Sequence, residues 1–389
     1  MAISIDMQLG IYTHPDDLED LKGSGGLSRL VDLGFGEIAV ASSYHAGRWL
    51  TPWSPGGLVR SLDDGVVHFH PGDTYGELRP MEGRVTLPSI IEEARELGLR
   101  TSAWTVLFHN SRLGREHPRS CVHNAFGDIY TYALCPARPE VREYGIGLLC
   151  DLAAHESLDA IELEAAGFMG YRHGSHHGKA SLELDAAADF LLSYCFCDAC
   201  CEGLVAQGVE PAALRDRVRE EVRHRIGDAD AMTPGQVDEP DRALAEALGE
   251  DAFAALLAHR RSVHVATLKD FREAVGDRVA LAVQIQPDPL FTGSQLGQDE
   301  RVIGPMVDEL VLTHYGEAVD RIAEIWGQLS CAGPARAAIW PKAPALTSDT
   351  ELRAVRETVQ SAGGQGLRIY ELGLLPWATI ERVAAALAG

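Results

Sequence analysis

The chain is short of basic residues for its length. Its 389 residues include 34 Lys and Arg against 57 Asp and Glu, which gives a formal net charge of −23. A nucleic-acid-binding surface needs a stripe of positive charge, and an anionic membrane surface attracts clusters of Lys and Arg. The composition therefore argues against both kinds of partner and favours an acidic surface that keeps the protein in solution.

Long apolar runs are missing as well. None reaches the ~20 residues that a membrane-spanning helix needs, and the first residues, MAISIDMQLG, lack the basic and apolar regions of a secretory signal peptide. We therefore expect a cytoplasmic protein. Because 46% of the residues are hydrophobic, the chain can bury a large core.

Close internal repeats and a Gly-rich phosphate-binding fingerprint are also absent. What recurs is a short apolar strand followed by a helix, and the missing polar alternation indicates burial on both faces. We predict one (β/α)8 barrel domain over residues 1–389. A doubly wound sheet is the alternative, but it usually carries the missing fingerprint. The expected strands are 8–14, 37–47, 100–110, 158–164, 279–287, 309–316, 337–343 and 366–375.

Two insertions interrupt this pattern. Residues 48–88 follow the second strand and are irregular and rich in Trp, Pro, Gly and His. Long loops inside a compact domain are usually functional or disordered, and the aromatic residues here favour an ordered lid over the barrel mouth. Residues 202–275 follow the fourth strand and are charged and Ala-rich, which predicts a helical insertion.

Polar and aromatic side chains gather just beyond the expected strand ends, where barrel enzymes keep their active sites. Aromatic, amide, imidazole and carboxylate groups together suit a carbohydrate or glycoside, although any barrel displays polar residues at its mouth. For the histidines of the loop RHGSHHGK (172–179), a second metal site and plain surface polarity stay open. The candidate substrate-binding residues are Tyr44, His45, Arg48, His109, Asn110, His173, His176, His177, Gln286, His314, Tyr315, Trp340 and Lys342.

Three glutamates are candidate catalytic groups. Glu162 and Glu164 end the fourth strand and point to the same side of it, because side chains alternate along a strand. Two close carboxylates cannot both stay ionised cheaply, so one pKa rises, as a general acid requires. Glu162 could instead be buried in a salt bridge to a barrel Lys or Arg. Glu371 follows the eighth strand, where it could act in catalysis or, with Tyr370, anchor substrate hydroxyls.

The cysteines are unevenly spread. Four of the eight fall within 195–201, and Cys195, Cys197 and Cys200 have the spacing C-x-C-x-x-C. This spacing favours a metal site over a disulfide scaffold, with buried structural cysteines or redox thiols as the alternatives.

Three segments together resemble the zinc-bearing β-galactosidases of glycoside hydrolase family 42. They are ALCPARPEVREY (133–144), the strand ending in Glu164, and CFCDAC (195–200). The resemblance implies that Cys135, Cys195, Cys197 and Cys200 bind a structural Zn²⁺ and that Glu164 is the general acid/base. Four thiolates would leave zinc no open position, which is the mark of a structural site.

Two positions depart from that family. Leu163 stands where the family has Asn, and the segment AAIWPKA (337–343) lacks the family's nucleophilic Glu. The nearest substitute is Glu371, one strand later. We therefore expect a relative within the same broad group of barrel glycosidases rather than a member of the family.

Three functions fit these observations. The first is a glycoside hydrolase that cleaves a glycosidic bond with paired carboxylates. The second is a metal-dependent sugar isomerase or epimerase, with Glu164, Gln286, His314 and Glu371 approximating a metal site. The third is a non-catalytic carbohydrate-binding barrel, which the missing carboxylate in 337–343 favours. The sequence leaves the oligomeric state open, a homo-oligomer included.

Overall fold

The computed structural model describes residues 7–173, 179–228, 239–329 and 333–387. Its centre is a closed barrel of eight parallel strands, because β1 pairs with both β2 and β15. The predicted (β/α)8 barrel is therefore confirmed. In order around the barrel the strands are β1 (Gln8–Thr13), β2 (Glu37–Tyr44), β7 (Arg100–Val106), β10 (Ala160–Glu164), β11 (Ala280–Gln286), β13 (Glu309–His314), β14 (Ala335–Ile339) and β15 (Gly366–Ile369).

Burial on both faces is what makes these segments barrel strands. Every residue of β2, β14 and β15 is buried. Alternate side chains point into the barrel or outward under the helices, so both sets must pack away from water. The carboxyl ends of all eight strands meet at one mouth, which positions the site.

The barrel interior contains a chain of paired charges. Arg368 Nη2 donates to Glu37 Oε1 at 2.6 Å, and Arg336 pairs with the other oxygen of Glu37. Arg336 Nε also donates to Glu309 Oε1 at 2.7 Å. Burial raises the pKa of Glu37, but the guanidiniums of Arg368 and Arg336 outweigh it and hold that pKa at about 2. These pairs join β2, β13, β14 and β15 inside the barrel.

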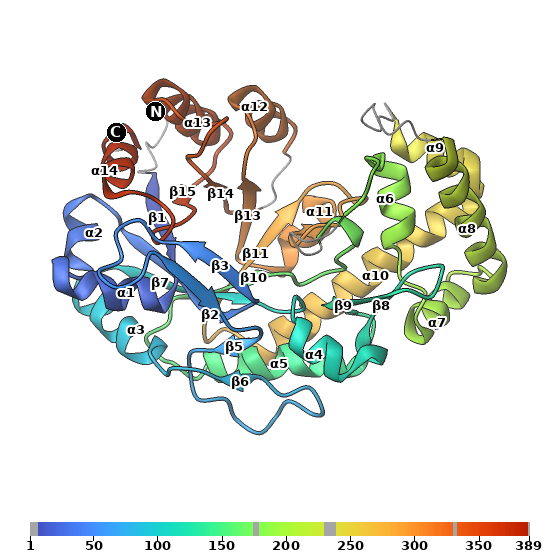
Figure 1. Cartoon of the computed structure of the whole chain (residues 1–389), viewed down its shortest axis with the longest axis horizontal. Helices are drawn as coiled ribbons and strands as arrows, with labels where there is room; N and C mark the ends of the chain where they lie inside the picture. The colour runs from blue at the N-terminus through green and yellow to red at the C-terminus, as the bar shows by residue number, and fades with distance from the viewer. Residues whose placement is uncertain (1–6, 174–178, 229–238, 330–332, 388–389) are drawn as a thin grey trace.

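Helices cover the outside of the barrel. α12 shows the reason, since Ile322, Ile325 and Trp326 recur at helical spacing and are its buried residues. In Figure 1, α12, α13 and α14 pack in sequence over the strands that end the chain. The outer helices are α1 (Pro15–Leu21), α2 (Ser28–Asp32), α3 (Leu87–Glu96), α5 (Pro139–Leu152), α10 (Glu250–Val275), α11 (Glu300–Ile303), α12 (Val319–Gln328), α13 (Asp349–Ser361) and α14 (Trp377–Leu387).

The segment after β2 contains four short strands. It forms a hairpin of β3 (Gly47–Leu50) and β4 (Val59–Leu62), followed by β5 (Val66–Val67), which pairs with β2, and β6 (Met81–Glu82). Trp49, Phe69, Tyr75 and Leu78 are buried within it. The insertion predicted at 48–88 thus consists of short strands joined by irregular stretches, and these aromatic and apolar side chains pack against the barrel.

A helical layer follows β10 and lies to one side of the barrel (Figure 1). Its own apolar cluster includes Phe190, Leu214, Val218, Leu244 and Leu256. Within the described parts of the chain, no helix is both long and apolar enough to cross a membrane. The helices of this layer are α6 (Ala186–Ser193), α7 (Asp198–Ala206), α8 (Pro211–Asp228), α9 (Pro240–Leu248) and α10. The connections after β7 and β11 contain the remaining short elements, α4 (Ser111–Glu116), β8 (Cys121–His123), β9 (Ile129–Leu134) and β12 (Leu296–Gly297).

Candidate active site

A cavity of about 720 Å³ opens at the carboxyl ends of the barrel strands. Many of the residues proposed from the sequence line it, namely Tyr44, His45, Arg48, Glu164, His173, Tyr315, Trp340 and Lys342. The remaining wall consists of Ala46, Gly47, Trp49, Leu50, Ser294, Gln295, Pro341, Tyr370, Leu374, Leu375, Pro376 and Thr379. The cavity thus joins residues from the second strand to the eighth.

Glu164 is the one carboxylate among the residues that line this cavity. Trp104 donates its indole Nε1–H to Glu164 Oε2 at 2.7 Å. Burial raises the pKa of Glu164 to about 7, against the opposing effect of hydrogen bonds from Trp104 and Ser294. A carboxyl group with this pKa holds a proton near neutral pH, which a general acid must do.

The backbone turns sharply after Glu164. Ala165 has a φ of 54°, in the left-handed region that costs an alanine about 1–2 kcal/mol. Its N–H donates to the carbonyl of Ser294 at 2.7 Å. Strained backbone of this kind gathers at functional sites, where the surrounding structure enforces it. The bond from the loop after β11 thereby fixes the end of β10, on which Glu164 stands.

Three tyrosine side chains surround the carboxylate. The hydroxyls of Tyr44 and Tyr370 lie 3.3 Å apart, and the buried hydroxyl of Tyr315 has no hydrogen-bond partner among the described residues. Burial raises the pKa of all three phenols, so they remain neutral. Neutral phenols can donate hydrogen bonds to oxygen atoms of a bound ligand.

Three histidine rings are in contact at one side of the mouth. The rings of His45 and His109 stack with their centres 4.2 Å apart, and His173 meets His109 edge to face, with its Nε2 3.2 Å from His109 Nδ1. Burial lowers the pKa of His109, and it lowers that of His173 to about 4. Both rings are therefore neutral near pH 7. His173 and His45 reach the cavity, whereas His109 lies behind them and outside its lining.

Glu162 lies in the barrel interior and not in the cavity lining. It is fully buried and pairs with Arg368, which also binds Glu37. Tyr12 donates its hydroxyl to Glu162, and Gln284 Nε2 donates to the same oxygen at 2.9 Å. These partners give Glu162 the buried salt bridge that the sequence left open as its alternative role.

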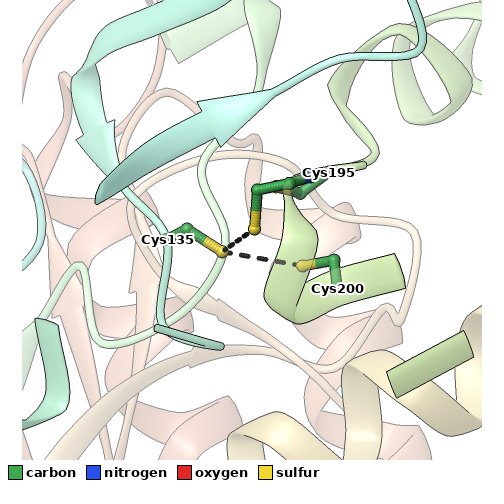
Figure 2. Close-up of side chains that lie close together, drawn as sticks. Cys135, Cys195 and Cys200 are labelled. Atoms are coloured by element: carbon green, nitrogen blue, oxygen red, sulfur yellow. Dashed lines mark hydrogen bonds between the residues drawn. The ribbon is translucent and has the colours of Figure 1, made fainter. Parts of the chain in front are cut away.

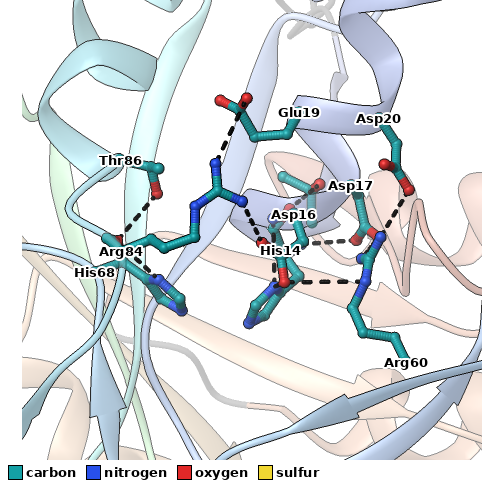
Figure 3. Close-up of polar contacts among 10 residues, drawn as sticks. His14, Asp16, Asp17, Glu19, Asp20, Arg60, His68, Arg84 and Thr86 are labelled. Carbon is teal, nitrogen blue, oxygen red and sulfur yellow. Dashed lines mark hydrogen bonds and ion pairs between the residues drawn. The ribbon is translucent and has the colours of Figure 1, made fainter. Parts of the chain in front are cut away.

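Glu371 is also fully buried and lies outside the cavity lining. Burial and the neighbouring carboxyl of Asp17 raise its pKa well above the usual range. Asp17 in turn accepts a hydrogen bond from Arg60 Nη1 at 2.6 Å and one from the backbone N–H of His14 (Figure 3). Glu371 therefore belongs to a buried layer that joins β15, α1 and the β3–β4 hairpin.

Three other candidates lie away from the cavity. Asn110 caps α4, since its Oδ1 accepts from Leu113 N at 2.9 Å. Gln286 donates to the carbonyl of Thr313 at 2.9 Å and lines a separate cleft. His314 is buried and bonded to Glu317 and to the indole of Trp326. His176 and His177 lie outside the described residues.

The four cysteines of the proposed metal site come together. Their sulfur atoms all lie within 4.8 Å of one another, and all four residues are buried. Cys135 Sγ lies 3.6 Å from Cys200 Sγ and 3.7 Å from Cys197 Sγ, and it points toward the 195–200 segment (Figure 2). Two sulfurs bound to one tetrahedral zinc would be about 3.8 Å apart. The cluster could hold a metal ion.

Sequence reasoning missed Trp104 and Ser294. Trp104 of β7 is paired with Glu162 of β10, and paired residues of neighbouring strands point to the same side of the sheet. The alternation of side chains along β7 could therefore have indicated that Trp104 faces the barrel interior. Ser294 and Gln295 lie in the connection after β11, for which no pattern marked a functional role. The apolar rim residues Leu50 and Leu374 were missed because neither carries a polar group.

No family model matches the chain, and no curated protein matches it in sequence. Solved structures do share its fold. The PgaB (BpsB) glycoside hydrolase domain from Bordetella bronchiseptica is 11% identical with a TM-score of 0.57, and the match covers 97% of this chain and 98% of that domain.

Two longer enzymes match as well. The α-L-fucosidase isoenzyme 2 from Paenibacillus thiaminolyticus is 14% identical with a TM-score of 0.55, over 98% of this chain and 49% of that one. A GH42 β-galactosidase from G. stearothermophilus is 12% identical with a TM-score of 0.54, over 98% of this chain and 56% of that one. The chain thus spans about half the length of these two enzymes. At such identities the likeness establishes the barrel fold, of a kind that glycoside hydrolases use.

Proposed function

We propose that the protein is a glycoside hydrolase in which Glu164 protonates the oxygen of the leaving group. The observation that carries this proposal is a single carboxyl group in the mouth cavity whose pKa burial raises to about 7. A general acid works best when its pKa lies near the working pH, and it contributes roughly 10²–10⁴-fold to the rate. The fold shared with glycoside hydrolases supports the same conclusion.

The other cavity residues suit a sugar ring. Tyr44, Tyr315 and Tyr370 supply neutral hydroxyls, and Trp340 supplies an apolar face beside Lys342, whose Nζ lies 4.1 Å from the indole centre. A few placed polar groups in a mostly apolar pocket fix the orientation of a small ligand. In this proposal Glu371 is a positioning residue that acts through Tyr370 and not a group that touches the substrate.

One observation favours the non-catalytic carbohydrate-binding barrel as a second candidate. Hydrolysis by paired carboxylates places a second carboxyl about 5–9.5 Å from the first, whereas Glu164 has no carboxylate companion in the cavity lining. The isomerase has weaker support, because Glu164, Gln286, His314 and Glu371 have separate partners and form no common site.

The experiment is turnover of a panel of 4-nitrophenyl glycosides, followed by comparison of that activated substrate with a methyl glycoside of the same sugar. We expect Glu164→Gln to reduce turnover of the methyl glycoside roughly 10²–10⁴-fold and to affect bond cleavage in the activated substrate far less. Glu381→Gln, at an exposed position on α14, is the control. Near-normal turnover of the methyl glycoside by Glu164→Gln would refute the assignment, and sugar binding without any turnover would establish the binding barrel.

We further propose that the cysteine cluster holds a structural Zn²⁺. Cys135, Cys195, Cys197 and Cys200 supply four sulfur ligands, the set that closed zinc sites use. The cluster lies outside the cavity lining, so the metal would stabilise the fold and take no part in the reaction.

A further inference from the structure

The β3–β4 hairpin has two unlike faces. Trp49 pairs across the ladder with Arg60, and Leu50 pairs with Val59. Because side chains alternate along a strand, Trp49 and Arg60 lie on one face and Leu50 and Val59 on the other. The first face is turned inward, since Trp49 is only 7% exposed and packs against His14 at 5.5 Å between ring centres.

The inner face and the tip are firmly attached to the barrel. Arg60 forms ion pairs with Asp17 and Asp20 of α1 at 2.6 and 2.7 Å (Figure 3). At the tip, Trp53 Nε1 donates to the carbonyl of Leu372 at 3.1 Å, and its ring lies 5.4 Å from that of Trp377. The hairpin is thus held against both the first and the last helix of the barrel.

The outer face holds Arg48 and Ser61, followed toward the tip by the apolar pair Leu50 and Val59. Leu50 is 59% exposed and Val59 61%, and Leu58, which precedes β4, is 52% exposed. Large apolar side chains exposed singly are ordinary, but a contiguous group marks a binding surface. These three lie together at the tip of one hairpin, and Leu50 lines the mouth cavity.

A second part of the cavity lining is also apolar. Leu374, Leu375 and Pro376 line it from the segment between β15 and α14. The polar groups that surround Glu164 come from the strand ends deeper in the barrel. On the rim the cations are Arg48, on the outer face of the hairpin, and Lys342, which lies over Trp340. The cavity therefore combines a polar floor with apolar walls from the hairpin and from the segment between β15 and α14.

We propose that these walls bind the apolar aglycone of the substrate, so that the substrates are glycosides of an aryl or alkyl alcohol. The inference rests on the proposed hydrolase function. Glu164 would protonate the glycosidic oxygen at the floor as the bond from that oxygen to the sugar breaks. Water would add its hydroxyl to the anomeric carbon and return a proton to Glu164, and the alcohol so formed would lie outward against Leu50 and Leu374. A hydroxyl-rich leaving group would find few hydrogen-bond partners there, whereas an aryl or alkyl group would remove Leu50 and its neighbours from water.

The first test measures binding without hydrolysis. The fluorescence of 4-methylumbelliferone, a free apolar aglycone, reports its binding to the wild type and to Leu50→Ser. We expect one site per chain and a loss of affinity of about 5–10-fold in Leu50→Ser, because part of an apolar contact is removed. Val205→Ser is the matched control, since Val205 on α7 is 61% exposed, close to the 59% of Leu50, but lies outside the cavity lining.

The second test uses a cleaved sugar with two leaving groups, octyl and glyceryl. Leu50→Ser should lower the ratio of kcat/KM for the octyl over the glyceryl glycoside by a similar 5–10-fold. An unchanged ratio, or an unchanged affinity for 4-methylumbelliferone, overturns the inference even if glycosides are cleaved. A wild-type dimer in light scattering that Val59→Ser dissociates also overturns it, because the face would then bind a second copy. If 4-methylumbelliferone binds as expected but no glycoside is cleaved, the apolar walls stand and the hydrolase proposal fails.

Discussion

The indole of Trp104 donates a 2.7 Å hydrogen bond to the Oε2 atom of Glu164. A hydrogen bond to a carboxylate favours its ionised form and so lowers its pKa. Burial works in the opposite direction and is the stronger of the two effects, since the pKa is raised to about 7. Burial therefore raises the pKa of the proposed acid, and Trp104 of the neighbouring strand β7 limits that rise.

This pairing predicts a shift in pH dependence. The protonated acid is present below about pH 7, so kcat/KM should fall as pH rises through that value. Trp104→Phe removes the bond that favours the ionised form, so the falling limb should move to higher pH by about 1 unit. The measurement is the pH profile of kcat/KM. Trp326→Phe, which removes an indole bond to His314, should leave the limb in place. A limb that persists in Glu164→Gln would assign it to another group.

Glu371→Gln should separate positioning from nucleophilic catalysis. The side chain is buried beside Asp17 and outside the cavity lining, so we expect less than about a 10-fold loss of kcat, alike for activated and poor leaving groups. Added azide should restore nothing. A far larger loss that azide rescues on an activated substrate would show that Glu371 attacks the sugar directly.

Cys197→Ser should abolish metal binding. Protein purified without added metal should contain one zinc per chain by elemental analysis, and the variant should lose it and unfold at a lower temperature. Cys201→Ser is the control, because Cys201 is the next cysteine in the chain but lies outside the group of four. Wild-type protein that is metal-free and fully stable would contradict the zinc site.

Glu37→Gln should destabilise the barrel by about 3–5 kcal/mol, because it removes the negative charge that two buried guanidiniums share and leaves each with one carboxylate partner. Urea unfolding measures this. The pKa of Glu37 is lowered from 4.5 to about 2, so its contribution is present above pH 4.5 and is lost as the pH falls through 2. Glu381→Gln, which breaks an exposed pair with Arg29, should cost less than about 1 kcal/mol. Equal losses in the two variants would contradict this account.

The barrel could be predicted from the sequence because strands buried on both faces read as short apolar runs. Their order followed from the chain, since each strand of such a barrel pairs with the next. The β3–β4 hairpin could not be read in the same way. Its strands are four residues each, and their inward face holds Trp49 and Arg60, which gives no apolar alternation.

The candidate site was predicted in part for a similar reason. Glu164 and Tyr44 lie at strand ends, and strand ends meet at the mouth whatever the rest of the chain does. The different roles of Glu162 and Glu164 could not be predicted, because Glu162 pairs with Arg368, a residue more than 200 positions away in the chain that lies in the barrel interior. His314 ends β13 and Asn110 follows β7, but their side chains are bonded to Trp326 and to the start of α4.

The mouth cavity is built from both ends of the barrel sheet. Tyr44 and Leu50 come from the second strand and the hairpin after it. Tyr370 and Leu374 come from the segment after the eighth strand, and the β1–β15 pairing closes the ring between the two sides. A ligand that touches both sides therefore links the two parts of the chain that the β1–β15 pairing brings together. Because it can bind the closed ring only, its binding free energy adds to the free energy of unfolding, and the melting temperature should rise with its concentration.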